Sequence, residues 1–411
     1  MPLNYNRRNA PFRRSLRRLL KNRSAVVGLI VISVAVILAF LGYSITPDAS
    51  PSANEQTLQI NHRPPGFKAI MLKVRKNREV ASHSFFYRML YGQDNPYELV
   101  PIVSYSIEGA NLIYHELSTS TPQGIKKSIP LAEVAYAISP DKPEIKVQNE
   151  EVSFYDLSNK YQTVQLSVLR EQVAAHNIED RTFLLGTDLY GRDILSRLII
   201  GIRVSLSVGL VAVIISMGIG ILLGAIAGYF RGWVDDIIMW LINVVWSIPT
   251  ILLVFAMTMA FDAQDRSMWQ LFIAIGITMW VDAARIVRGQ VMSTREVQFV
   301  EAARSLGYSH TRTMFIHILP NITGPLIVVA AANFASAILI EAGLSFLGIG
   351  VDPTTPSWGR MLSENYGYII SANVFLALVP GIAIMLMVLA FNLLGNGLRD
   401  AMDVKTSLQG K

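Results

Sequence analysis

Six long apolar segments constrain the fold of this chain more than any other feature. They are residues 25–43, 204–229, 237–261, 271–287, 322–347 and 374–394. Each is close to or above the roughly 20 residues that a helix needs to cross the hydrocarbon core of a bilayer. Only 16% of the 411 residues are charged, whereas about a quarter are charged in a typical soluble chain. We therefore predict an all-α polytopic membrane protein with six transmembrane helices, and we exclude an ordinary soluble enzyme, a coiled coil and a disordered protein.

The distribution of positive charge predicts the orientation of these helices. Eight cations and no acid precede Ser24, which places this end in the cytoplasm by the positive-inside rule. They are Arg7, Arg8, Arg13, Arg14, Arg17, Arg18, Lys21 and Arg23. Six spans return the C-terminus to the same side, and the arginine-rich stretch 285–320 falls inside as well. A cleaved signal peptide is the alternative for the first span, but its apolar stretch is longer than such peptides use. The basic residues are expected to contact anionic lipids of the inner leaflet.

Composition divides the chain into five parts. Residues 1–24 form a basic cytoplasmic segment, 25–45 the first transmembrane helix, 46–185 an extracytoplasmic insert, 186–398 a five-helix membrane core with a cytoplasmic loop at 290–320, and 399–411 a cytoplasmic tail. The insert contains apolar and aromatic runs with partial alternation, separated by Pro- and Gly-rich turns, and this pattern predicts a small β-rich domain. The runs are residues 97–105, 111–117 and 151–169.

Residue types that carry chemistry are sparse. Cysteine is absent, which excludes disulfides and thiolate metal sites. His62, His83, His115 and His176 are scattered along the insert without ligand spacing. We therefore predict no catalytic residue and no metal site.

The loop from Ser293 to Pro320 is the most informative stretch of the chain. Ser293 and Glu296 have the spacing of a capping box and predict a helix over 294–306, with Gly307 as its C′ residue. A second short helix is expected from Ser309 or His310 to Leu319, where Pro320 would end it. Two interpretations remain open: the first helix enters a groove of another protein, or the loop is a connector that packs on its own membrane core.

Within this loop, Glu301-Ala302-Ala303, Gly307 and Leu319-Pro320 resemble the EAA loop of ABC importer permeases. The version His317-Ile318-Leu319-Pro320-Asn321 is similar to the dipeptide/oligopeptide/nickel branch, although the general pattern has an apolar residue where His317 stands. Further motifs of that branch follow the same order: 185–188, 191–193, 196–197, 201–206, 284–289 and 357–362. The arrangement is closest to the C-type subunit, with an enlarged insert.

The resemblance implies a function and a set of partners. The chain would be the transmembrane permease of an ATP-driven importer for peptides or related small solutes in the bacterial inner membrane, with the insert periplasmic. Partners would be a homologous permease, two ABC ATPase subunits, an extracytoplasmic substrate-binding protein and membrane lipids, and no nucleic acid. ATP and Mg would be bound by the ATPases, because no G-x-x-x-x-G-K-[ST] occurs here. Seven residues would couple to the ATPase: Glu301, Ala302, Ala303, Gly307, His317, Leu319 and Pro320.

Several residues inside the spans are candidates for the translocation path or for helix packing. Gly220, Gly224 and Gly228 form a double G-x-x-x-G that lets helices approach closely, within this subunit or against the partner. Pro249 is expected to kink the third span. Glu341 faces either a pathway or the outer interface. Asn243, where the family often has Asp, is a further path candidate.

Two alternatives from other classes remain at this point. An ion-coupled secondary transporter would need intramembrane acids near the midplane, and Glu341 and Asp282 are the candidates. Asp282 and Arg285, three residues apart, are instead expected to pair on one helix face. A sensory or scaffold protein would use the insert as its active part. The substrate stays open among peptides, nickel chelates and glutathione-like solutes.

Overall fold

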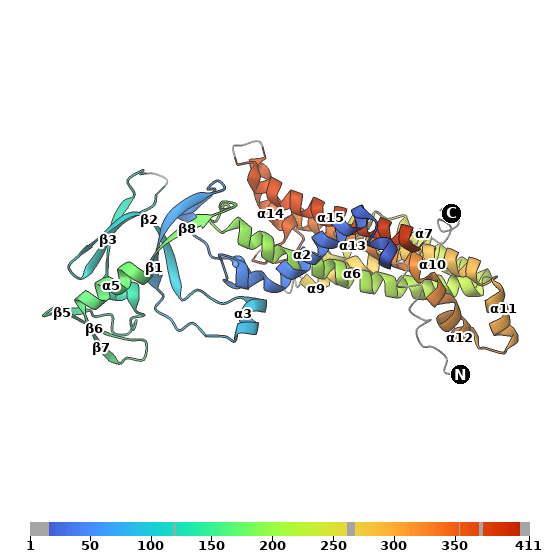
Figure 1. The fold of residues 1–411 in the computed structure, drawn as a ribbon, viewed down its shortest axis with the longest axis horizontal. Coiled ribbons are helices and arrows are strands. Elements are labelled where there is room, and N and C mark those ends of the chain that lie inside the picture. The colour runs from blue at the N-terminus through green and yellow to red at the C-terminus, as the bar shows by residue number, and fades with distance from the viewer. Residues whose placement is uncertain (1–15, 119–120, 261–267, 353, 370–372, 403–411) are drawn as a thin grey trace. The chain divides into compact units, whose positions relative to one another are not determined.

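The computed structural model describes residues 16–118, 121–260, 268–352, 354–369 and 373–402. The predicted basic residues Arg7, Arg8, Arg13 and Arg14 lie outside this part. The chain forms two compact units (Figure 1). Unit 1 consists of Met1–Ala39, Gly201–Tyr366 and Ala377–Lys411, and unit 2 of Phe40–Ile200 and Gly367–Leu376.

Long apolar helices run through unit 1. Among the described residues, five helical stretches are long and apolar enough to cross a membrane: Arg23–Ile45, Ile194–Phe230, Met268–Thr294, His310–Phe346 and Phe375–Met402. Their helices are α2 (Arg23–Ile45), α6 (Ile194–Phe230), α9 (Met268–Thr278), α10 (Trp280–Thr294), α12 (His310–Arg312), α13 (Thr323–Phe346) and α15 (Phe375–Met402). The expectation of a polytopic, mostly helical membrane protein is confirmed.

The third predicted span, residues 237–261, is not one straight helix. It is a pair, α7 (Gly232–Trp246) and α8 (Thr250–Ala260), bent by 86° and counted as a sixth span if the two are taken together. The break contains Pro249, whose ring removes one backbone donor and clashes with the preceding turn. The kink expected at Pro249 is therefore a full change of direction.

Close packing between α6 and α10 depends on the three spaced glycines. A Cβ on Gly220 would lie 2.5 Å from Ala283 Cβ, and one on Gly224 would lie 2.4 Å from the Ala284 carbonyl oxygen. A Cβ on Gly228 would lie 2.6 Å from the Arg288 carbonyl oxygen. The glycine face of α6 thus packs against α10 of the same subunit.

Unit 2 contains the β-structure expected for the insert, so that part of the fold prediction is confirmed. One sheet has the order β4-β3-β2-β1-β8 and a second the order β5-β6-β7, with antiparallel pairs throughout both. The strands are β1 (Phe67–Arg75), β2 (Tyr97–Glu108), β3 (Asn111–Glu116), β4 (Ile125–Pro130), β5 (Lys146–Gln148), β6 (Glu151–Tyr155), β7 (Tyr161–Gln165) and β8 (Ile178–Phe183). The helices are α3 (Phe85–Tyr91), α4 (Leu131–Ala135) and α5 (Leu166–His176).

The core of the insert is formed where α4 and α5 cover the strands. Leu72, Leu112, Leu131, Phe154 and Leu169 are buried together in one apolar cluster. The apolar run 151–169 was expected to be strand throughout, but its last residues form the start of α5. A short apolar run does not by itself distinguish a buried strand from a buried helix.

Candidate functional site

The loop between α10 and α13 carries the short helix α11 (Gln298–Ser305). The predicted capping box is wrong, because Ser293 and Thr294 are the last residues of α10 and α11 begins after Val297. Glu296 does not fold back on its own helix. Its carboxylate accepts a hydrogen bond from the Arg231 guanidinium at 2.6 Å, and this ion pair lowers the pKa of Glu296.

The C-terminus of α11 follows the prediction for Gly307. This residue has φ +77°, its N–H donates to the Arg304 carbonyl at 2.8 Å, and the N–H of Tyr308 donates to the Ala303 carbonyl at 3.2 Å. These two bonds form a Schellman motif, which satisfies carbonyls that a helix end leaves unpaired. Gly307 therefore fixes the direction in which the chain leaves α11.

Opposite faces of α11 have different environments. Val300 is buried in the cluster that contains Met314 and Ile318, and Ala303 is buried as well. Glu301 and Ala302 are exposed, as are three large apolar side chains. Those are Val297 at 45%, Phe299 at 40% and Leu306 at 73%. One face thus anchors the helix to its own subunit, as the connector interpretation expects, while the other presents apolar groups around a carboxylate, as a docking helix would.

The second helix of the loop, which begins with α12 (His310–Arg312), does not end at Pro320, contrary to the sequence prediction. The backbone instead continues from α12 through a π-helix at Thr313–Ile318 and a 3-10 helix at Leu319–Ile322 into α13. Such local changes of helix type accommodate a residue without an N–H, and the Asn321 side-chain amide donates to the His317 carbonyl at 2.6 Å. The His317 ring stacks on Tyr308, with centroids 5.4 Å apart.

Tyr229, near the end of α6, is a residue of this site that the sequence analysis missed. It is 2% exposed, and its hydroxyl is hydrogen-bonded to His310 Nδ1 at 2.9 Å. The guanidinium groups of Arg304 and Arg295 lie 5.1 and 5.6 Å from its ring centroid. Burial, together with repulsion from Arg304 and Arg231, lowers the pKa of Arg295. Tyr229 thus connects α6 to the loop before α11, near the C-terminus of α11 and after it.

The path candidates Asn243 and Pro249 lie on and just after α7. Asn243 Oδ1 accepts a hydrogen bond from Arg285 at 3.0 Å, and the same guanidinium lies 4.3 Å from the Trp246 ring centroid. The expected pairing of Arg285 with Asp282 is replaced by these contacts to α7. A cavity of about 270 Å³ lies at the α7–α8 bend and is lined by Asp282 and Asn333 among others.

Glu341, on α13, is completely buried within unit 1. The Ser345 hydroxyl donates to its Oε1 at 2.6 Å, and the Ser357 side chain is a second hydrogen-bonding neighbour of the carboxylate. Its neighbour Ala342 lies against Gly359 of α14 (Trp358–Asn365), where a Cβ would lie 2.5 Å from the Ala342 carbonyl oxygen. Glu341 is therefore enclosed by its own subunit in this conformation.

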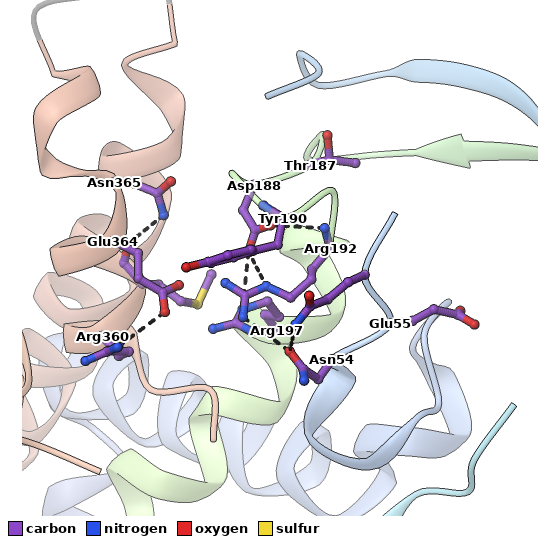
Figure 2. A network of polar contacts seen from close by, with 12 residues as sticks. Asn54, Glu55, Thr187, Asp188, Tyr190, Arg192, Arg197, Arg360, Glu364 and Asn365 are labelled. Carbon is purple, nitrogen blue, oxygen red and sulfur yellow. Dashed lines mark hydrogen bonds and ion pairs between the residues drawn. The ribbon is translucent and has the colours of Figure 1, made fainter. Parts of the chain in front are cut away.

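The motif at 185–197 is held together by its own charges, as Figure 2 shows. Within unit 2, Asp188 accepts from the Arg192 side chain at 2.7 Å and from the backbone N–H groups of Tyr190 and Arg192. Arg192 also donates to Asn54 at 3.3 Å, and its guanidinium lies over the Tyr190 ring. Within unit 1, Arg360 pairs with Glu364 at 3.2 Å. The buried Asp188–Arg192 pair gives the motif a structural role.

Comparison with known proteins matches two stretches of the chain to families. Residues 220–407 match the binding-protein-dependent transport system inner membrane component, and residues 10–65 match the N-terminal TM domain of oligopeptide transport permease C. Residues 66–219 lie outside both matches.

Individual relatives agree with these families. The chain is 41% identical over 221 residues to the glutathione transport system permease protein GsiD of Pectobacterium atrosepticum, which covers 54% of this chain and 72% of that protein. It is 43% identical over 220 residues to the dipeptide transport system permease protein DppC of Alkalihalophilus pseudofirmus, covering 54% and 71%. A solved structure of the inward-facing MetNI methionine ABC transporter aligns with 51% of this chain and 98% of its own, at a TM-score of 0.41 and 18% identity.

Proposed function

Because this chain belongs to the inner-membrane permeases of binding-protein-dependent ABC transporters, we propose that it forms the translocation path of an ATP-driven importer for peptides or related small solutes. The observation that carries the substrate class is its identity of 41% to 43% with permeases named for glutathione and dipeptide transport. Glutathione is itself a small peptide, so one solute class accounts for both relatives. Nickel chelates are the competing substrate class. The chain is a transport component, and we assign ATP hydrolysis to separate subunits.

The proposed coupling element is the exposed face of α11 together with Gly307. Val300 and Ala303 are buried and anchor this helix. Because Val300 packs in one apolar cluster with residues of α6 and α13, a force applied to the outer face of α11 would be transmitted to those two helices. We propose that Glu301 and Ala302, with the apolar side chains beside them, bind one of two ABC ATPase subunits. ATP and Mg would be held by those subunits. His317, Leu319 and Pro320 would then set the helix geometry behind the docking face.

The translocation path would be shared with a homologous permease. The helix break at Pro249 adjoins the cavity at the α7–α8 bend, which Trp246 and Asp282 line, and Asn243 precedes Trp246 by three residues on α7. Polar groups at membrane depth usually face a cavity or a partner. Glu341 would reach this path only after α14 moves, because α14 packs against α13 beside it. Alternating access of such a path is a rigid-body rearrangement driven by the ATPases.

Both termini are proposed to be cytoplasmic and the insert periplasmic. The support is the excess of Arg and Lys before the first span and in the α10–α13 loop. An extracytoplasmic binding protein would deliver the substrate to the insert side. Membrane lipids would be a further partner of the chain.

Purification of the tagged full chain in mild detergent, followed by mass spectrometry of the proteins that accompany it, tests this function. We expect a second permease and an ATPase with a Walker motif. Glu301→Lys should lose the ATPase and keep the permease, whereas the matched charge reversal Glu171→Lys, on an exposed position of α5, should keep both. A chain that purifies alone, under conditions that preserve known complexes, would contradict the importer proposal and favour an ion-coupled transporter.

A further inference from the structure

The short helix α3 has an unusual surface for a segment of the insert. Its sequence is Phe-Phe-Tyr-Arg-Met-Leu-Tyr, and none of these seven described residues is buried. The exposed fractions are 59% for Phe85, 71% for Phe86, 43% for Leu90 and 62% for Tyr91. Contiguous exposed apolar surface of this kind marks an interaction site in a soluble or peripheral domain.

Backbone contacts fix α3 beside the end of the first membrane helix. The N–H of Gln93 donates to the Ala49 carbonyl at 2.9 Å, and a Cβ on Gly92 would lie 2.8 Å from that same oxygen. Ala49 follows the last residue of α2, Ile45, by four residues, a stretch that spans at most about 14 Å. The N–H of Ser52 also donates to the Tyr43 hydroxyl at 2.9 Å. The C-terminus of α3 is therefore tied to the segment that follows the end of α2 (Figure 1).

The side of α3 that faces the end of α2 is hollow. A cavity of about 450 Å³ lies there, lined by Tyr43 and Ser44 from α2 and by Phe85, Arg88 and Met89 from α3. Phe86 and Tyr91 of α3 remain exposed at 71% and 62%, and none of the side chains of this helix is buried. Both sides of the helix are thus available to a surrounding medium.

We propose that α3 is a membrane-docking helix of the insert, which lies in the bilayer interface where α2 ends. Aromatic side chains concentrate at this level of a membrane because their rings are amphipathic, and short apolar helices bury one face at the boundary of headgroups and acyl chains. Leu41 and Ile45, on the last turns of α2, are also exposed apolar side chains, at 41% and 46%. Arg88, the one cation of α3, lines the cavity beside α2 and would bind the phosphate of a lipid that enters it.

A docked α3 would give the insert a second attachment to the membrane besides its chain connections. The first attachment is the end of α2. The second, α3, would restrain the segment of residues 76–96 that connects β1 to β2. A binding protein is the other candidate occupant of the aromatic surface. The membrane is favoured because the contacts to Ala49 hold α3 at the level of the helix end, and because α3 carries aromatic groups and an arginine but no acid.

The absence of cysteine from the chain permits a direct test by site-directed spin labelling. Single cysteines would replace Phe86 in α3, Ile37 in α2 as a membrane reference, and Val147 in β5 as a water reference; all three positions are exposed. The full chain, with its co-purified partners, would be placed in lipid nanodiscs. Power saturation then gives the ratio of accessibility to oxygen over a water-soluble nickel chelate.

We expect the ratio at position 86 to exceed that at 147 and to approach that at 37. It should fall when nanodiscs are exchanged for an amphipol, while the ratio at 147 stays the same. A ratio at position 86 equal to that at 147 in nanodiscs would overturn the proposal. So would protection that develops only after an extracytoplasmic binding protein is added, because the occupant would then be that protein.

Discussion

Arg288 of α10 holds Asp235 of α7 through two parallel hydrogen bonds, 2.5 Å from Nε to Oδ1 and 2.6 Å from the terminal nitrogen to Oδ2. The side chains are 27% and 11% exposed, so the pair is largely removed from solvent. Bidentate pairing of this kind fixes both distance and orientation. It ties the helix before the 86° bend to the helix that leads into α11, and so connects the proposed path to the proposed coupling element.

Replacing Arg288 by Met should destabilise the subunit. Removing one partner leaves a buried, uncompensated carboxylate, which costs about 3 kcal/mol in measured cases. The expected result is a lower apparent melting temperature of the full chain in mild detergent. The double variant Asp235→Asn/Arg288→Met should recover most of the loss, because it removes the charge as well as its partner. A double variant as unstable as the single one would show that packing of the arginine stem, not the ion pair, stabilises this contact.

The positive φ of Gly307 predicts a graded mutational series. Asn tolerates this backbone region, Ala is strained there by about 1–2 kcal/mol, and Pro can neither adopt it nor donate the N–H that Arg304 accepts. Substrate uptake should therefore decrease in the order Gly307→Asn, Gly307→Ala, Gly307→Pro, with membrane insertion unchanged. Uptake by Gly307→Pro at the wild-type level would refute the coupling role of this turn.

The pKa of Asp156 yields a prediction for the insert. Its carboxylate accepts hydrogen bonds from the Gln162 side chain and from the N–H groups of Lys160 and Ser158, and these lower its pKa. A lowered acid pKa contributes stability above the ordinary value of about 3.9, and that contribution is lost as the pH falls through the folded value. Hydrogen exchange of the β6–β7 amides, corrected for intrinsic rates, should accelerate in acid more in wild type than in Asp156→Asn. If exchange accelerated equally in both proteins, the Asp156 carboxylate would not be the cause of the acid sensitivity of these strands.

The parts of the fold that were predictable from sequence depend on local signals. Apolar length identifies the membrane helices, and a glycine two residues past the last helical position identifies the turn at Gly307. Turn residues around β2 and β3 likewise mark the strands. These signals work because hydropathy and backbone sterics act within a few residues.

What escaped prediction depends on contacts between distant segments. Glu296 has the spacing of a capping box, yet it pairs with Arg231, 65 positions away. Arg285 contacts Asn243 and Trp246 of α7 and not Asp282, with which it was expected to pair. Tyr229 carries no motif, and its role follows from the return of the loop to the end of α6. Pro320 is accommodated because the backbone changes from a π-helix to a 3-10 helix around it. No local sequence pattern predicts this change.

The glycines of α6 provide a matched pair for testing how the core is packed. A Cβ on Gly224 would lie 2.4 Å from the Ala284 carbonyl oxygen, whereas one on Gly218 would meet nothing within 4 Å. Gly224→Ala should thus force α6 and α10 apart and cost about 1–3 kcal/mol. Gly218→Ala should be neutral or slightly stabilising, because alanine favours a helix by about 1 kcal/mol. Thermal stability of the two variants in the same detergent checks this, and equal losses would show that flexibility of α6, rather than its contact with α10, is what the glycines supply.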